Sequence, residues 1–426
     1  MNQDNSNNRE LLYCNLQQQL KKYNNVRNLM EFFQVEHLKR QHFKMKSEKS
    51  AGIDNITKSV YAKNLDANLE DLVYRIKHHT YIPKKLRRCY IPKSNGKFRP
   101  IDIPAYEDKL VQSLIAEILN EIYEPIFLNC SFGYRPNIGC HSALIELSKI
   151  LKNPRIHYVI KCDIHSFFIN MDHQFLIDFL KKTIKDKHFI KYINMFIKSE
   201  IQYKDKVFYN KKGVPQGGLM SPILANVYLH YVLDSWFEHE IKPIYKDSAL
   251  IRYCDDFVVC LGNMSDATNF LIAVADRLNE YSLGLSEDKT KIFRFNIFDI
   301  SSEYFNFLGI NVSIKPNGLL SYTSTESRLE RKLQDIRLRL EKELSGGVNL
   351  FVLRQTSNNF LRGNFAYYKF DTNYEWLQKL KYETLDLLLN IAAAHDDPYT
   401  KKRLAYYLKT NPLINAPKDD DLIYIN

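Results

Sequence analysis

Apolar positions along the chain recur with two different spacings, and the spacing changes several times. Apolar residues at every third or fourth position predict amphipathic helices, whereas short runs of β-branched and aromatic residues predict strands. Helices are predicted over about residues 9–46, 59–79, 106–124, 139–152, 172–199 and 264–282, and over most of the chain after residue 323. Interspersed helices and strands followed by helices alone predict an α+β body with a helical C-terminal part.

Four hairpins and two single strands are predicted between these helices, and one of the hairpins is centred on Asp255 and Asp256. The first hairpin lies within Tyr81–Pro104, where an Asn-Gly step in a basic turn is a strong hairpin signal. The other hairpins are "IQYKDKVFYN" and "FNFLGINVSIKPNGLLSY", and the single strands are "HYVIKCDI" and "TKIFRF". A glycine turn before Pro222 predicts a helix start there.

The stretch "RYCDDFVVC" places two adjacent carboxylates, Asp255 and Asp256, between two strand-like runs. Neighbouring side chains of a strand point to opposite faces, so both can serve one site only if the chain turns at them. A plain hairpin turn, which Asp tolerates, is the alternative. Asp163, at the end of another predicted strand, supplies a third carboxylate. The set favours a site for two Mg²⁺ ions, for which Mn²⁺ can substitute, bridged by Asp163 and Asp255 with Asp256 as a weaker member.

The net charge and the cysteines indicate which class of partner the protein binds and which cellular compartment it occupies. Lys and Arg outnumber Asp and Glu by 60 to 49, which gives the chain of 426 residues a net charge of +11. This surplus favours nucleic acid as a partner, with ordinary solubility charge as the alternative. Seven cysteines without a C-x-x-C pair argue against a disulfide framework or a zinc site. We expect a cytoplasmic protein, because a reducing cytosol suits these cysteines and neither an apolar signal segment nor a run of ~18 apolar residues is present.

The motif "YCDD" resembles the Tyr-x-Asp-Asp signature of reverse transcriptases, and further segments agree with the prokaryotic, group II intron-like branch in their order and spacing. These segments are "KSNGKFRPIDIP", "SFGYRPNIGCHSAL", "CDIHSFFINMDH", "GVPQGGLMSPILANVYLH", "GLSEDKTKIF" and "FNFLG". The resemblance covers roughly residues 49–312 and continues more weakly through "LRGNFAYYKF".

The resemblance implies a right-hand polymerase fold. We expect a helical extension over residues 1–48, and fingers and palm over 49–320 with an antiparallel palm sheet flanked by helices. An all-helical thumb and C-terminal helices would follow over 321–426.

The resemblance also implies roles for individual residues. The three aspartates would bind metal, and Lys289 would be the general acid. The nucleotide would meet Lys93, Arg99, Phe168, Gln216 and Gly217, and the primer grip would be Phe307, Leu308 and Gly309. Phe168 would exclude a 2′-hydroxyl. Core packing for Phe168 and solvent exposure for Lys93 and Lys289 are the alternatives.

The predicted helix "ESRLERKLQDIRLRLEKEL" has one apolar stripe, and Arg331 and Arg339 lie on its other faces. We expect these two arginines to contact the phosphates of a bound duplex, with an ordinary solvated helix as the alternative. The N-terminal segment mixes Lys and Arg with aromatic residues, which favours either an RNA-contacting extension or a helical cap on the fingers.

Within the family, the compact chain with Cys254 in its signature most resembles the defence-associated reverse transcriptases of the unknown-group lineage, type 2. That resemblance implies an RNA-directed DNA polymerase that copies a structured noncoding RNA into cDNA from deoxynucleoside triphosphates, in anti-phage defence. A maturase-like, RNA-binding splicing cofactor and an untemplated DNA polymerase of the abortive-infection type are the alternatives.

Overall fold

The computed structural model describes residues 2–46, 50–92, 98–299, 302–345, 349–394, 400–418 and 422–423. The chain forms two compact units. Unit 1 comprises residues 1–140, 162–259 and 265–291, and unit 2 comprises residues 141–161, 260–264 and 292–426. Each unit is described separately below.

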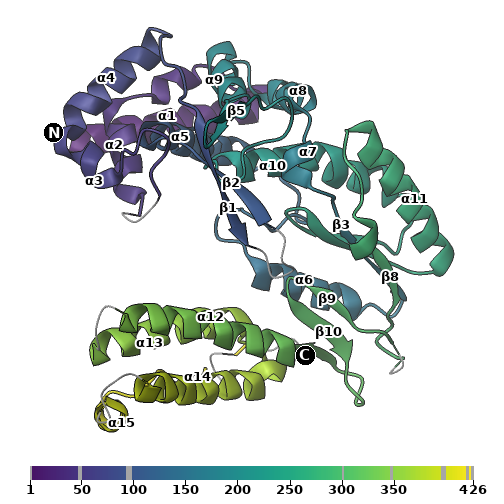
Figure 1. Ribbon diagram of the computed structural model, residues 1–426. Coiled ribbons are helices and arrows are strands. Elements are labelled where there is room, and N and C mark those ends of the chain that lie inside the picture. Colours follow the sequence, from purple (N-terminus) through teal and green to yellow (C-terminus); the bar gives the residue numbers. More distant parts are fainter. Residues whose placement is uncertain are drawn as a thin grey trace. The chain divides into compact units, whose positions relative to one another are not determined.

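Unit 1 is built mainly of helices (Figure 1). They are α1 (Asn2–Tyr23), η1 (Leu29–Phe32), α2 (Val35–Lys44), α3 (Lys58–Tyr61), η2 (Ala62–Asn64), α4 (Leu65–Lys77), α5 (Tyr106–Tyr123), α7 (Phe167–Asn170), α8 (His173–Thr183), α9 (Lys187–Ile197), α10 (Ser221–Leu229), η3 (His230–Asp234), η4 (Phe237–Ile241), α11 (Met264–Glu280) and η5 (Glu287–Lys289). Helix α5 is buried over most of its length, and α1, α2 and α10 pack against it.

A four-stranded sheet of unit 1 has the order β2-β1-β4-β5. Its strands are β1 (Leu86–Pro92), β2 (Phe98–Ile103), β4 (Ile201–Tyr203) and β5 (Lys206–Phe208). Strands β1 and β2 pair antiparallel, from Arg87 opposite Ile103 to Pro92 opposite Phe98. The pairing confirms the first predicted hairpin, although its turn lies outside the described residues. Strands β4 and β5 also pair antiparallel and confirm the second.

A second four-stranded sheet has the order β6-β7-β3-β8. Its strands are β3 (Tyr158–Asp163), β6 (Ala249–Tyr253), β7 (Asp256–Leu261) and β8 (Lys291–Arg294). The chain enters unit 1 within β3, at Cys162, and leaves it within β7, after Val259. Apolar residues of β6 and β7 are buried, as expected for strands covered on both faces.

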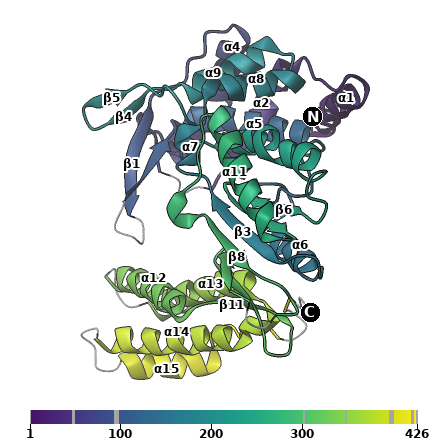
Figure 2. The same cartoon turned by 90° about the vertical axis from the view of Figure 1, so that its right-hand side faces the viewer.

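Unit 2 contains a small sheet and a helical bundle (Figure 2). Its elements are α6 (Cys140–Leu151), β9 (Phe305–Phe307), β10 (Ile310–Ile314), β11 (Leu320–Thr323), α12 (Glu326–Leu344), α13 (Leu350–Tyr368), η6 (Asp371–Asn373), α14 (Tyr374–Ala394) and α15 (Thr400–Thr410). Strands β9, β10 and β11 form an antiparallel meander, and α12, α13 and α14 all pack against one another. The mixture of sheets and helices is that of the predicted α+β, right-hand polymerase class.

The predicted continuous helical region over residues 9–46 is wrong in one place. Helix α1 ends at Tyr23 and α2 begins only at Val35. Between them Asn24 and Asn28 adopt left-handed backbone conformations, which asparagine tolerates better than most residues. Val26 is fully buried there and pairs with Ile184 in an isolated bridge, so tertiary pairing interrupts the helix.

The predicted helix start near Pro222 is confirmed, because α10 begins at Ser221 with Pro222 in its first turn. After α10 the helical hydrogen-bonding pattern changes, which rotates the residues that follow relative to a regular α-helix. Two π-helical segments, η3 and η4, follow α10, and each π turn carries one residue more than an α turn. Among the described helices, none combines the length and the apolar composition needed to cross a membrane.

Candidate active site

The two adjacent aspartates lie where the chain turns between neighbouring strands. Asp255 belongs to the two-residue turn that joins β6 to β7, and Asp256 is the first residue of β7. Cys254, the other turn residue, has a left-handed backbone (φ 60°). Asp163 ends the adjacent strand β3, and the amide of Ile164 donates to the Asp255 carbonyl at 3.4 Å. The turn therefore brings Asp255 to the end of the strand that carries Asp163.

The charges of all three aspartates act on one ammonium group, that of Lys289. Burial, and then the negative charge of Asp163, raises the pKa of Asp255 above its ordinary value. Lys289 Nζ donates to Asp163 Oδ2 at 2.8 Å. This hydrogen bond, reinforced by the charges of all three aspartates, raises the pKa of Lys289. The predicted acids and the predicted lysine thus lie within electrostatic reach of one another.

The donor set fits a hard divalent cation. Mg²⁺ prefers oxygen ligands, takes few protein carboxylates and keeps positions for water or phosphate oxygens. Over the described part of the chain, no group of three or more His, Cys, Asp and Glu residues is arranged to hold a metal ion. Asp163 and Asp255 lie at the ends of adjacent strands and remain the predicted main ligands, with substrate oxygens to complete the shell.

A buried guanidinium lies behind the turn. Arg252, at 0% exposure, precedes the signature tyrosine. Its Nε donates to Asp234 Oδ1 at 2.6 Å, and its Nη2 donates to Asp234 Oδ2 at 2.5 Å and to Ser131 Oγ at 2.7 Å. Its Nη1 donates to Asn226 Oδ1 at 3.0 Å and to the Cys254 carbonyl at 3.2 Å. All five N–H groups of the guanidinium have acceptors.

This network ties the turn to two other segments. Ser131 belongs to the block "SFGYRP", and Asn226, which is in α10, also donates to the Gly133 carbonyl at 2.7 Å. A Cβ at Gly133 would lie 2.6 Å from the Cys254 nitrogen, so only glycine fits beside the turn. Arg252 therefore fixes the backbone from which Asp255 projects.

Arg99 is the predicted nucleotide ligand that the structure brings to the aspartates. It is exposed on β2, opposite Ile91, and its charge is one of those that lower the pKa of Asp255 against the effect of burial. Lys93, the other predicted triphosphate ligand, lies outside the described residues. The guanidinium of Arg99 is thus placed for an anion that approaches Asp255.

The turn that contains Gln216 and Gly217 is hydrogen-bonded to β2, the strand that carries Arg99. The amide of Asp102 in β2 donates to the Gln216 carbonyl at 2.7 Å. Gly217 has φ 126°, and a Cβ there would lie 2.7 Å from the Asp102 carbonyl oxygen. This close backbone approach requires glycine. Strand β2 therefore positions both Arg99 and the predicted nucleotide-binding turn.

Phe167 and Phe168 are neighbours in sequence, but Phe167 lies in the core and Phe168 is partly exposed. Phe167 is buried at 1% exposure and packs on Tyr228, with ring centroids 6.2 Å apart. Phe168 is half-buried in the short helix α7, five residues after Asp163. Its neighbour takes the core position, so part of the Phe168 side chain remains accessible to a ligand.

In unit 2, the predicted primer grip is a tight turn between β9 and β10. Phe307 is fully buried, whereas Leu308 (φ 50°) and Gly309 (φ 78°) form the turn itself. Tyr367 Oη of α13 donates to the Leu308 carbonyl at 2.6 Å. The guanidinium of Arg328, from α12, lies against Gly309. Two helices of unit 2, α12 and α13, therefore hold this turn.

One face of α12 is strongly basic. Arg331 and Arg339 are both exposed on it. Burial, together with repulsion from Arg331, Arg328 and Arg339, lowers the pKa of Lys332. Lys332 and Arg339 also line a cavity of about 340 Å³ with Gly363 and Tyr367 of α13. The two predicted nucleic-acid ligands therefore belong to a larger cationic surface.

Sequence reasoning missed the supporting residues Arg252, Asp234, Asn226 and Tyr367. A signal for Arg252 was present, because a charged residue inside the apolar run "ALIRY" must be paired if the strand is buried. Nothing in the local sequence pointed to Asp234 or Asn226 as its partners, since both lie in an unbroken helical pattern.

Replacing Asp255 with Asn should stabilise the fold at neutral pH. The raised pKa of Asp255 means that its charge destabilises the folded state. This effect grows as pH rises from the ordinary value of 3.8 through the raised one, and is constant above it. Thermal unfolding without divalent cations should give Asp255→Asn a higher Tm than the unmodified chain at pH 7, and an equal Tm below the ordinary value. Asp276→Asn, at an exposed position of α11, should leave Tm nearly unchanged. A lower Tm for Asp255→Asn at pH 7 would contradict the electrostatic description.

Removing one member of the Arg252–Asp234 ion pair should strongly lower the free energy of unfolding. Arg252→Met leaves a buried carboxylate without its counter-charge, at a cost of about 3–5 kcal/mol in the free energy of unfolding. Adding Asp234→Leu should recover most of that loss, as measured by urea unfolding. Lys242→Met is the control, because both it and its partner Glu238 are exposed to water and the loss should be small. A double variant as unstable as Arg252→Met alone would show that the pairing is not the source of the loss.

Comparison with known proteins agrees with this site. Residues 91–312, which contain all three aspartates, match the family described as reverse transcriptase (RNA-dependent DNA polymerase). The Group II intron-encoded protein LtrA of Lactococcus lactis subsp. cremoris is 26% identical over 424 residues, which cover 79% of this chain and 69% of that protein. Protein YkfC of Escherichia coli K12 is 30% identical over 282 residues, which cover 59% of this chain and 74% of YkfC. The putative COX1/OXI3 intron 2 protein of Saccharomyces cerevisiae is 27% identical over 64% of this chain and 37% of its own length.

The family match spans more than half of the chain and includes the β2 strand, the glycine turn, the aspartate turn and the primer-grip turn described above. The fold, the arrangement of acidic and basic side chains and the relatives all point the same way: the chain belongs to the reverse transcriptase family and is an RNA-directed DNA polymerase.

Proposed function

We propose that this chain copies a cognate structured noncoding RNA into cDNA by two-metal nucleotidyl transfer, and that the product serves bacterial anti-phage defence. The convergence of Asp163, Asp255 and Lys289, inside a chain of this family, carries the chemical part of the proposal. The choice of template and the defence role rest on the resemblance to defence-associated enzymes, together with the basic surplus of the chain.

Reverse transcriptases generally use divalent metal ions, and Asp163, Asp255 and Asp256 are the groups that would hold Mg²⁺ or Mn²⁺ here. When bound, two such ions would activate the primer hydroxyl and stabilise the leaving oxygen. Lys289, kept protonated by its raised pKa, would donate a proton to the departing pyrophosphate. Because Asp163 holds that ammonium group in the free protein, Lys289 must exchange this hydrogen bond for one with the leaving group.

The nucleotide would approach from the side of β2. Arg99, and Lys93 on the same hairpin, would bind the triphosphate, where a guanidinium can contact two phosphate oxygens at once. The backbone of Gln216 and Gly217, fastened to β2, would lie along the nucleotide. Phe168 would lie beneath the sugar and exclude a 2′-hydroxyl.

Template and primer would be held by the thumb and the primer grip. The Phe307–Gly309 turn would seat the primer end through its backbone. Arg331 and Arg339 would contact duplex phosphates, an interaction that weakens as salt rises. In the N-terminal segment, Arg40 and Lys44 instead form ion pairs with Glu117 of α5, which favours the helical-cap role for these two residues.

Similarity to intron-encoded proteins supports a second candidate, a maturase-like RNA-binding cofactor. The two candidates differ in what they require. A splicing cofactor needs RNA binding but not the aspartates, whereas a polymerase needs both. An untemplated polymerase would keep the aspartates but yield cDNA unrelated to any bound RNA.

The central test is sequencing of the RNA and cDNA that co-purify with the native protein, with and without phage. We expect one discrete structured RNA and cDNA complementary to it. In the Asp255→Ala, Asp256→Ala variant the RNA should persist, the cDNA should fall by at least about 10³-fold, and plaque protection should be lost. Heterogeneous cellular RNA with unchanged plaque counts would defeat the template and defence proposals. Undiminished cDNA in the folded variant would defeat the assigned chemistry.

Phe168→Ala should admit ribonucleotides, because removing the ring opens space for the 2′-hydroxyl. Single-nucleotide incorporation with dNTP and rNTP measures the discrimination ratio, which should fall by about 10²-fold or more with little change for dNTP. Phe167→Leu is the matched control, since Phe167 lies in the core and its truncation should lower stability rather than selectivity. Unchanged discrimination in Phe168→Ala would return this residue to a packing role.

A further inference from the structure

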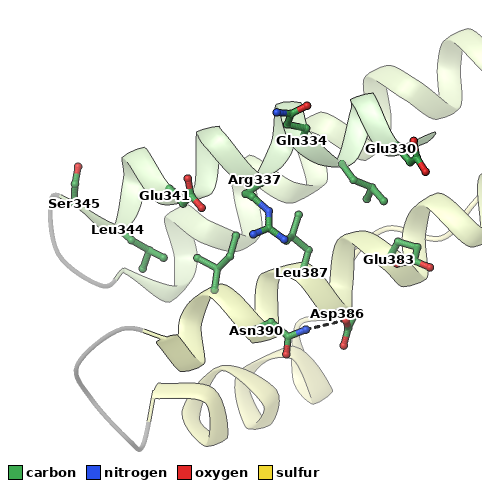
Figure 3. Close-up of a pocket in the computed structure, with 12 residues that line it drawn as sticks. Glu330, Gln334, Arg337, Glu341, Leu344, Ser345, Glu383, Asp386, Leu387 and Asn390 are labelled. Carbon is green, nitrogen blue, oxygen red and sulfur yellow. Dashed lines mark hydrogen bonds between the residues drawn. The ribbon is translucent and has the colours of Figure 1, made fainter. Parts of the chain in front are cut away.

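A groove that the proposed chemistry does not use lies between α12 and α14 of unit 2 (Figure 3). It has a volume of about 740 Å³ and follows α12 from Glu330 to Ser345. At the helical rise of 1.5 Å per residue, this stretch is roughly 24 Å long, or about four helical turns. The groove therefore has the length of a short helix rather than of a small molecule.

The floor of the groove is apolar. Leu333 and Leu344 of α12 face Leu387 and Ile391 of α14. Leu344 and Leu387 are buried, whereas Leu333 and Ile391 are partly exposed along the opening. A partner with an apolar stripe could cover them and remove this surface from water.

The rim of the groove is acidic. Glu330 and Glu341 extend from α12, and Glu383 and Asp386 extend from α14, so carboxylates line both sides. Among the described residues that line the groove, Arg337 is the one cation, and Figure 3 shows it between the two helices. Lys379 lies just outside the lining, and its hydrogen bond to Glu326, reinforced by the charges of Glu383 and Glu330, raises its pKa. Four carboxylates against these two cations still leave the groove negative, on a chain whose net charge is +11.

The two sides of α12 therefore have opposite charge. Lys332 and Arg339 line the cavity shared with α13, where burial, and then the charges of Arg331 and Arg328, lower the pKa of Lys332. Asp335 lies among these four cations and leaves that side with a net positive charge, whereas the acidic groove opens on the side toward α14. Carboxylates repel phosphates, so nucleic acid held by the basic side would not enter the groove. One helix thus separates a surface suited to polyanions from a surface suited to cations.

We propose that this groove is a docking site for a partner protein, which inserts a Lys- and Arg-rich amphipathic helix. The apolar stripe of that helix would pack on the leucines, in the helix-in-groove manner, and its cationic flanks would pair with the carboxylates. Charge complementarity selects this occupant over an RNA or an acidic peptide. The site is independent of polymerase chemistry and would connect the enzyme to another protein.

The test uses the full chain, freed of nucleic acid, and fluorescence anisotropy of labelled peptides of about 18 residues, close to the groove length. The probe contains leucine and lysine spaced to give one apolar helical face. One comparison peptide has the same composition in an order without that face, and another has glutamate in place of lysine. We expect the first to bind and the two comparison peptides to bind at least about tenfold more weakly.

Variants then locate the binding site. Glu330→Lys combined with Glu383→Lys reverses charge on both sides of the groove and should weaken binding by about tenfold or more. Glu343→Lys combined with Glu375→Lys changes exposed residues of the same two helices outside the lining, and should have little effect. Gln334→Glu adds a carboxylate to the lining and should strengthen binding by about two- to fivefold, a gain that misfolding cannot produce.

Each opposite result would overturn the proposal. Equal losses in the groove variant and the control variant would mean non-specific charge attraction. Equal binding of the reordered peptide would mean that no helical face is recognised. Sedimentation that shows a dimer of the chain, abolished by the groove variant, would assign the groove to a second copy instead. Primer extension should be unchanged in every groove variant, so failure here would not affect the proposed polymerase function.

Discussion

The guanidinium of Arg252 is surrounded by five acceptors and has no exposed surface. A buried cation is tolerated only when a counter-charge and hydrogen bonds replace the water it has lost. Meeting that requirement brings together segments that are far apart in sequence: the loop before α6, helix α10, the first π segment and the turn of the signature motif. The position of Asp255 relative to Asp163 depends on this assembly, because the last donor of Arg252 holds the carbonyl of the residue before Asp255.

The acidic and basic groups of the chain are sorted by location. At the end of β3, Asp163 accepts a hydrogen bond from Lys289, the charges of Asp255 and Asp256 act on the same ammonium group, and the charge of Arg99 acts on Asp255. On α12, the side next to α13 has a net positive charge and the side next to α14 has a net negative charge. The turn predicted to be the primer grip is held by Tyr367 of α13 and Arg328 of α12. A displacement of either helix would therefore reach the turn directly, through side chains rather than through a loop.

The sequence was a good guide wherever a feature is local. Alternation and turn residues predicted the hairpins around Arg99 and the aspartates, and proline with a glycine turn predicted the start of α10. The break between α1 and α2 was missed because Val26 pairs with Ile184, a residue far along the chain. The Arg252 network was missed for the same reason, since neither Asp234 nor Asn226 differs locally from any polar residue on a helix. Motif resemblance located the chemical groups, but not the buried pair that supports them.

The first π segment has a consequence for how related chains can vary in length. In a regular α-helix, the residue about seven positions after Asn226 returns to the same face, and that residue is the buried Leu233. The wider turn of η3 adds one residue and brings Asp234 to that face instead. A relative shorter by one residue here would present a leucine to the arginine. Insertions and deletions in this family should therefore avoid this segment, and a gap placed there in an alignment would pair residues with different partners.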